Sequence, residues 1–183
     1  PVFFFHAQAG QREAQESRGL GDVYKRQAVY DLGVYVVQSA FYSAQDHPIS
    51  VKARSWTDRN EIYKEIPEHW QWELEWGNGK ISKHSSSYGK YENFIHLETE
   101  MGEIGLNPAY SYRGIKGYTP DGYIKFGPVF QQKLQIDNQC LAILNKKPNI
   151  TPGEMGRRDV RVLNAIMESA KTNQKVIFEN FKF

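Results

Sequence analysis

The stretch His69–Trp76, HWQWELEW, alternates polar and apolar side chains along its whole length. Successive side chains of a β-strand point to opposite faces, so this stretch as a strand has one apolar face and one polar face. Such a strand is typical of an antiparallel sheet that is covered on one side only. We interpret the apolar set as core rather than as a ligand platform. It consists of Trp70, Trp72, Leu74 and Trp76.

Further strand-like segments lie on both sides of this stretch. Residues 77–79, Gly-Asn-Gly, predict a hairpin turn directly after it. The segment 49–56 is rich in β-branched and aromatic residues, which favours a strand before it. Four segments after the turn read as a polar strand, two short strands, and Tyr-rich edge strands or a long loop. Their ranges are 80–91, 92–100, 101–108 and 109–127.

Helical spacing appears before and after this strand region. Residues 28–44 carry apolar side chains at intervals of three and four, with Gly33 inside the segment. Such a glycine often allows another part of the chain to approach closely. Residues 130–147 predict a second helix that ends at Pro148.

A last helix is predicted within residues 151–174. Thr151 stands three positions before Glu154, which matches a capping box, and the expected apolar face is Val160, Leu163, Met167 and Ala170. The order of helix, strands and two helices predicts an α+β fold with an open, mostly antiparallel β-sheet and helices packed on one face.

The composition excludes several classes of function. The 183 residues carry a net charge of only +2, which argues against a nucleic-acid partner or a membrane surface. No apolar run approaches the roughly 18 residues of a membrane helix. The single cysteine, Cys140, rules out an intrachain disulfide and is expected to be a small buried residue. The five histidines lack metal-ligand spacing and no glycine-rich phosphate loop follows a strand, so we expect no metal site.

The first 27 residues differ from the rest, because they show no sustained period of a helix or a strand. Their end, GDVYKRQ at 21–27, resembles translated adapter or vector sequence. We therefore expect residues 1–27 to be a non-native or disordered segment, and residues 28–183 to form the domain. A native, partly disordered tail is the alternative.

Two sets of side chains could carry chemistry. Asp31 and Tyr35 stand four positions apart, so one helix would place both on the same face. A carboxylate beside a phenol can orient a hydroxyl and support proton transfer, although a cap and a half-buried core residue are the commoner roles. Ser85 and Ser87 fall on one side of a predicted strand and could line a polar pocket, or simply face solvent.

Three stretches carry a family resemblance. They are YDLGVYVVQSAFY from Tyr30, KISKHSSSYGKY from Lys80 and ITPGEMGRRDVRVLNAIMESAKT from Ile150. Together, and in this order, they resemble the C-terminal domain of the Gfo/Idh/MocA oxidoreductases of the glucose–fructose oxidoreductase type. The resemblance covers nearly all of residues 28–183.

The resemblance implies a substrate-binding and oligomerisation domain whose N-terminal Rossmann domain, the main NAD or NADP site, is missing. Tyr35 takes the place of the family's acid/base residue, Asp31 would hold a substrate hydroxyl, and Ser85, Ser87 and Tyr88 would bind substrate. The full-length protein would transfer hydride to or from a sugar or polyol, and the present chain alone would be inactive.

It also implies a homo-oligomer, a dimer or tetramer, formed through the open sheet face. The implied location is cytoplasmic, or periplasmic if an export signal lies in the missing part. The alternative is a non-enzymatic carbohydrate-binding or assembly domain, in which Trp70, Trp72 and Tyr88 would stack on sugars.

Overall fold

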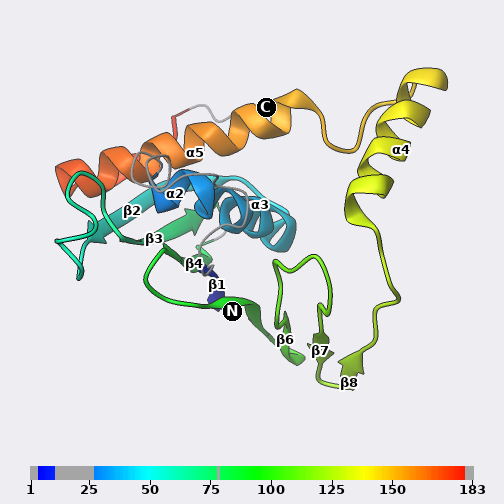
Figure 1. The fold of residues 1–183 in the computed structure, drawn as a ribbon, viewed down its shortest axis with the longest axis horizontal. Helices are drawn as coiled ribbons and strands as arrows, with labels where there is room; N and C mark the ends of the chain where they lie inside the picture. The colour runs from blue at the N-terminus through cyan, green and yellow to red at the C-terminus, as the bar shows by residue number, and fades with distance from the viewer. Residues whose placement is uncertain (1–3, 11–26, 78, 180–183) are drawn as a thin grey trace.

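Nine strands form a single sheet in the computed structural model (Figure 1), which describes residues 4–10, 27–77 and 79–179. The strand order is β8-β7-β6-β5-β1-β4-β3-β2-β9. Neighbouring strands are antiparallel except for β1 and β4, which are parallel. The strands are β1 (Phe4–Gly10), β2 (Pro48–Trp56), β3 (His69–Trp76), β4 (Ile81–Ser87), β5 (Asn93–Thr99), β6 (Gly102–Leu106), β7 (Gly117–Thr119), β8 (Gly122–Ile124) and β9 (Val176–Ile177).

Strand β3 has the predicted alternation, and its apolar set lies on the covered face. Trp72 stands opposite Ala53 of β2 on one side and opposite His84 of β4 on the other. All four apolar side chains of β3 are buried, whereas Glu73 on the other face is exposed. The alternation therefore decides which face of the sheet the helices cover.

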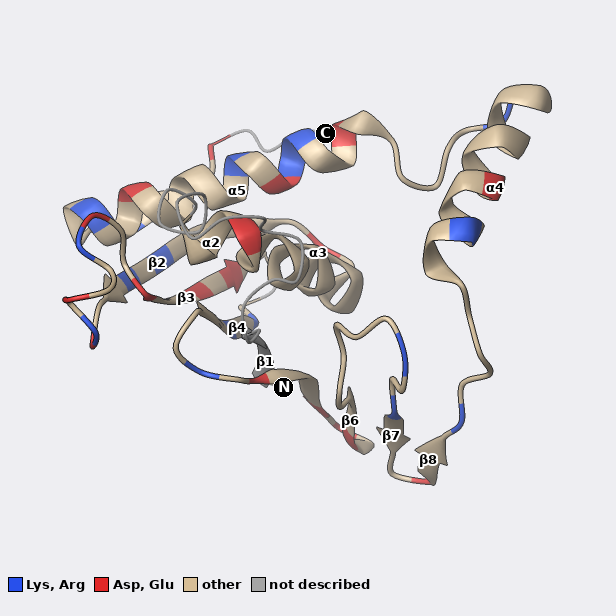
Figure 2. Ribbon diagram, viewed as in Figure 1, with Lys and Arg blue, Asp and Glu red and all other residues tan. Residues whose placement is uncertain are grey.

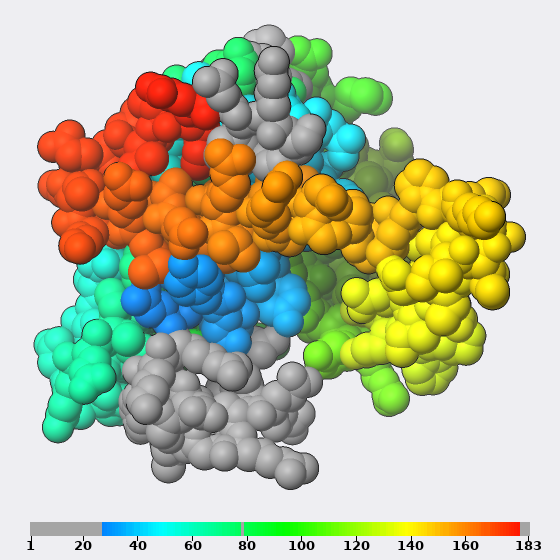
Figure 3. Space-filling model, turned by 90° about the horizontal axis from the view of Figure 1, so that it is seen from above, coloured from blue at the N-terminus to red at the C-terminus, as the bar shows by residue number. Residues whose placement is uncertain are grey.

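Three of the four described helices cover that face (Figure 1). They are α2 (Ala28–Asp31), α3 (Gly33–Ala44) and α5 (Gly153–Thr172). Helix α3 packs on β1 and β4, while α5 packs on β2 and lies beside α2 and α3 (Figure 3). Helix α4 (Gln131–Leu144) stands apart from the sheet (Figure 1). The α+β fold with an open, mostly antiparallel sheet is confirmed, and α4 departs from the expectation that all helices pack on it.

The core lies between β3 and these helices. Phe41 of α3 meets Trp76 edge-on with ring centroids 5.8 Å apart, and the Arg158 guanidinium of α5 lies 3.7 Å from the Phe41 centroid. Leu163 and Ile166 of α5 are completely buried against the same cluster. Each such side chain contributes about 1.5–3 kcal/mol when it is removed from water.

The buried face of α5 differs from the predicted one. Val160 is 46 % exposed, and the residues that face the core follow the spacing that begins at Asp159. They are Asp159, Val162, Leu163, Ala165, Ile166 and Ser169. The predicted capping box is also wrong, since α5 begins after Pro152 without a side-chain cap, and the Thr151 backbone N–H donates to Asn149 Oδ1 instead.

Residues 4–10 form a strand between β5 and β4. The prediction that residues 1–27 are non-native or disordered stays a prediction, because strand pairing does not decide the origin of a sequence. Residues 1–3 and 11–26 lie outside the described part of the chain.

Charged residues of both signs are interspersed over the elements, as Figure 2 shows. Helix α4 carries only two of them, Lys133 and Asp137, which form an ion pair. Cys140 on this helix is exposed, so the expectation of a buried cysteine is wrong, because α4 does not pack on the core. No helix among the described residues is long and apolar enough to cross a membrane.

Candidate functional site

The predicted single helix over 28–44 is in fact two helices that meet at Leu32. Helix α2 ends at Asp31, Leu32 has φ −108°, and α3 begins at Gly33. Gly33 is buried against the sheet, where a Cβ would lie 3.4 Å from the Trp72 ring and 3.5 Å from Ser86 Oγ. Gly33 does lie against β3 and β4, but at these distances a Cβ would make ordinary van der Waals contacts, so this approach does not require glycine.

Asp31 meets Tyr88 at this junction. Tyr88 directly follows β4, and its hydroxyl donates a hydrogen bond of 3.1 Å to Asp31 Oδ2. The two residues are 57 positions apart in the chain. A half-buried carboxylate beside a phenol is an arrangement that can bind and orient a hydroxyl-rich ligand.

Tyr35 lies in the first turn of α3, and 51 % of its surface is exposed. Its ring lies 6.3 Å from that of Tyr110, centroid to centroid. The Tyr110 hydroxyl is 2.8 Å from Ser39 Oγ of α3, and burial raises the pKa of Tyr110 above its usual range, although the hydrogen bond with Ser39 opposes the shift. The Tyr110 phenol therefore stays protonated, and its ring packs beside the ring of Tyr35.

Sequence reasoning did not single out Tyr110, which lies in the Tyr-rich segment after β6. Asn93 at the start of β5 holds it in place, because Asn93 Oδ1 accepts the backbone N–H groups of Ala109 at 2.9 Å and Tyr110 at 2.6 Å. The sequence pattern around Tyr110 does not indicate its contact with Asn93, because the two residues are 17 positions apart.

Ser85 and Ser87 lie on the other face of the sheet from α2 and α3. In β4 the covered face takes Ser86, opposite Trp70, so the neighbouring serines point the other way. Ser87 is 7 % exposed, and its Oγ lies 2.7 Å from His69 Nδ1 and accepts the N–H groups of Gly89 and Lys90. The structure therefore brings Tyr88, but not these two serines, to Asp31.

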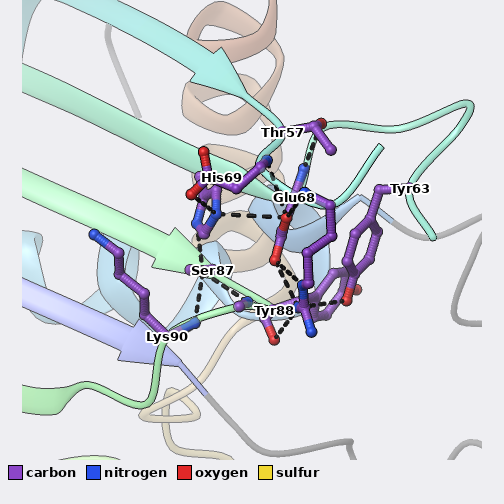
Figure 4. Close-up of polar contacts among 10 residues, drawn as sticks. Thr57, Tyr63, Glu68, His69, Ser87, Tyr88 and Lys90 are labelled. Carbon is purple, nitrogen blue, oxygen red and sulfur yellow. Dashed lines mark hydrogen bonds and ion pairs between the residues drawn. The ribbon is translucent and has the colours of Figure 1, made fainter. Parts of the chain in front are cut away.

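A buried network lies at the end of β4, as Figure 4 shows. Its centre is Glu68, which is 1 % exposed. Glu68 Oε2 accepts the backbone N–H groups of Asp58 at 3.2 Å and Arg59 at 3.0 Å, while Oε1 accepts Arg59 Nε at 2.6 Å. A second contact joins Arg59 Nη2 to Glu68 Oε1 at 2.5 Å.

The electrostatics of Glu68 follow from these donors. Burial raises the pKa of the Glu68 carboxyl, but the hydrogen bonds from the Arg59 guanidinium and from the two backbone N–H groups outweigh burial. The net result is a pKa below the usual range for glutamate. The carboxylate is therefore charged at neutral pH and is a fixed part of the framework.

His69 joins Ser87 to Asp58, since its Nε2 lies 3.0 Å from Asp58 Oδ2. The order of serine, histidine and aspartate is that of an acyl-transfer triad. The Ser87 oxygen, however, already accepts two backbone N–H groups and is nearly buried, so a substrate carbonyl cannot reach it. The group is structural, and it turns the chain after β4.

Trp70 and Trp72 are buried under the helices, at 3 % and 1 % exposed. A sugar ring cannot stack on either of them without unfolding this part of the core. Of the aromatic residues expected to bind carbohydrate in a non-enzymatic module, only Tyr88 is in reach of a ligand. Among the described residues, no group of three His, Cys, Asp or Glu side chains is placed to hold a metal ion.

No protein-family model matches the chain. Among solved structures, the aldose-aldose oxidoreductase of Caulobacter crescentus in complex with glycerol has a TM-score of 0.86 at 24 % identity, over 97 % of this chain and 56 % of its own. This chain has the fold of a Gfo/Idh/MocA C-terminal domain.

Two further structures share the Gfo/Idh/MocA fold at lower identity. Myo-inositol 2-dehydrogenase from Lactobacillus plantarum has a TM-score of 0.72 at 10 % identity, over 97 % of this chain and 57 % of its own. Scyllo-inositol dehydrogenase from Lactobacillus casei, with NAD(H) and scyllo-inositol, has a TM-score of 0.67 at 11 % identity, over 96 % and 56 %. The present chain thus spans little more than half the length of each.

Proposed function

We propose that this chain is the C-terminal, substrate-binding part of an NAD(P)-dependent oxidoreductase that transfers hydride to or from a sugar or polyol. The contact between Asp31 and Tyr88 carries the proposal, because it places a carboxylate and a phenol together at the α2–α3 junction. The fold supports it, since the structures it resembles include dehydrogenases of inositols and an aldose oxidoreductase.

Each side chain at this junction has a distinct proposed role. Asp31 accepts a hydrogen bond from a substrate hydroxyl, and its bond with Tyr88 leaves acceptor capacity on both carboxylate oxygens. Tyr88 orients that carboxylate. Tyr35, whose phenol is half exposed one turn along, exchanges a proton with the substrate oxygen that changes between hydroxyl and carbonyl. Ser85 and Ser87 take no part in this proposal, because they lie on the opposite face.

The described residues do not fit a dinucleotide. Pyrophosphate is bound by free backbone N–H groups at a helix start that follows a strand and a glycine-rich turn. The start of α3 is covered, since Gly33 is packed against Trp72, and Gly153 at the start of α5 follows Pro152 rather than a strand. We therefore assign NAD or NADP to another part of the whole protein.

Oligomerisation through the open face of the sheet is part of the same proposal. The face opposite the described helices carries side chains such as Gln71, Lys83 and Phe94, which are only half-buried. A second copy would cover this face and form a dimer, or a tetramer if a further contact exists.

A titration of the isotope-labelled chain with myo-inositol tests the substrate site. We expect amide shifts to change at Asp31, Tyr35 and Tyr88, and binding to weaken in Tyr35→Phe but not in Tyr42→Phe, an exposed tyrosine on the same helix. Shifts confined to the open face would instead favour a non-enzymatic carbohydrate-binding domain, and an absence of binding would contradict the proposal.

Activity requires the whole protein. In it we expect Tyr35→Phe to reduce nicotinamide-linked turnover of aldoses and polyols by about 10²-fold or more, since general acid–base catalysis contributes on that order. Tyr42→Phe is the matched control and is expected to retain turnover. Normal turnover by Tyr35→Phe would remove Tyr35 from the mechanism.

A further inference from the structure

We propose that Glu68, buried on the far side of Tyr88 from Asp31, is a positioning residue that sets where the Tyr88 hydroxyl lies. The inference deepens the proposed function, on which the importance of Tyr88 depends. Its basis is a chain of contacts from Glu68 through Arg59 and Tyr63 to Tyr88 (Figure 4). The Tyr88 hydroxyl continues this chain to Asp31.

The segment between β2 and β3 is held together by hydrogen bonds to Glu68. The carboxylate holds both the backbone and the guanidinium of Arg59, as described above, and the Glu68 backbone N–H donates to Thr57 Oγ1 at 3.3 Å. A buried carboxylate with this many donors is rigid, because breaking any one bond leaves a buried polar group unsatisfied. Residues 57–68 are thereby fixed relative to the start of β3.

Residues 57–68 contact Tyr88 in three ways. The Tyr88 backbone N–H donates to the Glu68 carbonyl at 3.2 Å, and Arg59 Nη2 donates to the Tyr88 carbonyl at 3.4 Å. The Tyr63 ring is nearly parallel to the Tyr88 ring, with centroids 6.1 Å apart and an angle of 11°. Arg59 also lies 5.2 Å from the Tyr63 centroid, so one guanidinium supports both the backbone and the ring stack.

The residue after Tyr88 completes the arrangement. A Cβ on Gly89 would lie 2.1 Å from Glu68 Oε1 and 2.8 Å from His69 Cε1, so the chain can pass the carboxylate only with glycine at this position. The Glu68 network therefore contacts the backbone of Tyr88, stacks on its ring through Tyr63, and leaves room only for glycine at the next position. At the tip of the ring, the Tyr88 hydroxyl donates its hydrogen bond to Asp31.

The first measurement needs no ligand. In protein with ¹³C-labelled tyrosine rings, we expect the Tyr88 ring signal, assigned from Tyr88→Phe, to shift and broaden in Glu68→Gln. Glu75→Gln is the matched control, since Glu75 is another ion-paired glutamate of the same strand region, bonded to Ser50 and Lys175. A Tyr88 signal that is unchanged in Glu68→Gln overturns the inference, whatever happens to binding.

The second measurement is a double-mutant cycle with myo-inositol as the probe. We expect Glu68→Gln and Tyr88→Phe each to weaken binding about tenfold, the loss typical of one hydrogen bond to a charged group. The double variant should be no weaker than Tyr88→Phe alone, because Glu68 acts through Tyr88. Additive losses would mean that Glu68 acts by another route and would contradict the proposal.

Tyr63→Leu provides a second variant in case Glu68→Gln does not fold. It removes the ring stack in a half-exposed segment and leaves the buried carboxylate and its donors in place. The expected result is the same shift of the Tyr88 ring signal with a smaller loss of affinity. If the wild-type chain binds no polyol while the Tyr88 signal still responds to both variants, the proposed function fails and the positioning role stands.

Discussion

At the scale of single residues, the candidate site depends on side chains whose neighbours are distant in the chain. The spacing to Tyr35 points to Asp31, but no pattern in the sequence pairs Asp31 with Tyr88, and none points to Glu68. The missing information is physical: hydrogen bonds between residues 57 positions apart leave no periodic trace in the sequence. Gly89 and Glu68 are the residues at which single substitutions should reveal this dependence most directly.

Gly89→Ala should destabilise the protein by about 2–3 kcal/mol, the range typical of a disrupted buried network. The added methyl group would meet a carboxylate oxygen that is held by several donors and cannot move freely. Thermal and urea unfolding of the variant measure the loss. Gly156→Ala is the control, because that glycine of α5 has open space around it and alanine favours a helix. Equal stability of both variants would contradict the described packing.

The Glu68 carboxylate should make stability depend on pH at the acidic end. Its pKa is lower in the folded state than in the unfolded state, so the unfolded state binds more protons between the two pKa values. The stabilisation is complete above the unfolded-state pKa of about 4.3 and is lost as the pH falls through the folded-state pKa. The difference in free energy of unfolding between wild type and Glu68→Gln should therefore be constant near neutrality and shrink below about pH 4. A difference in the free energy of unfolding that grows as the pH falls would mean that folding raises the pKa of Glu68, and would contradict this prediction.

At the scale of elements, local periodicity predicted which segments are helices and strands better than it predicted their ends. The segment 28–44 contains two helices instead of one, with the break at Leu32, where φ is −108°. The buried face of α5 also differs from the predicted one. Its contact with β2 is set by Ser169, whose hydroxyl accepts the Ala53 backbone N–H at 2.9 Å and donates to the Gln174 carbonyl at 2.6 Å.

Helix α4 should be the least stable helix of the isolated chain. Of its 14 residues only Ala142 is buried, while five apolar side chains are exposed. These are Leu134, Ile136, Leu141, Ile143 and Leu144. A helix of this length has marginal stability in water without tertiary packing.

Hydrogen exchange followed by mass spectrometry measures this difference in stability. We expect the amides of α4 to exchange within minutes, while those of α3 and α5 stay protected for hours. The sample should be monomeric in this experiment, since association could cover α4. Protection of α4 equal to that of α5 in a monomer would mean that α4 has a partner within the chain.

At the scale of the whole molecule, the sheet has helices on one face and leaves the other face to a partner in the proposed assembly. Phe94 lies on that open face, half-buried in β5. Phe94→Glu should shift any dimer or tetramer towards monomer by about tenfold or more in dissociation constant, since a charge would be buried in the interface. Sedimentation equilibrium measures the shift, and Tyr91→Glu, an exposed position outside the strands, serves as the control. A wild-type chain that is monomeric at high concentration would contradict assembly of this chain through the open face.

The fold class and the covered face of the sheet follow from the amino-acid sequence alone, because the alternation in His69–Trp76 is a local pattern that burial must satisfy. The spacing of Asp31 and Tyr35 placed both on one face of a single helix, whereas in the structure they belong to the two helices α2 and α3. Three contacts become visible only in the folded chain: Tyr88 meets Asp31, Ser87 takes part in a chain turn, and the Glu68 network holds the backbone of Tyr88. Those contacts join separate strands and loops, and their geometry follows from strand register and packing rather than from any local period.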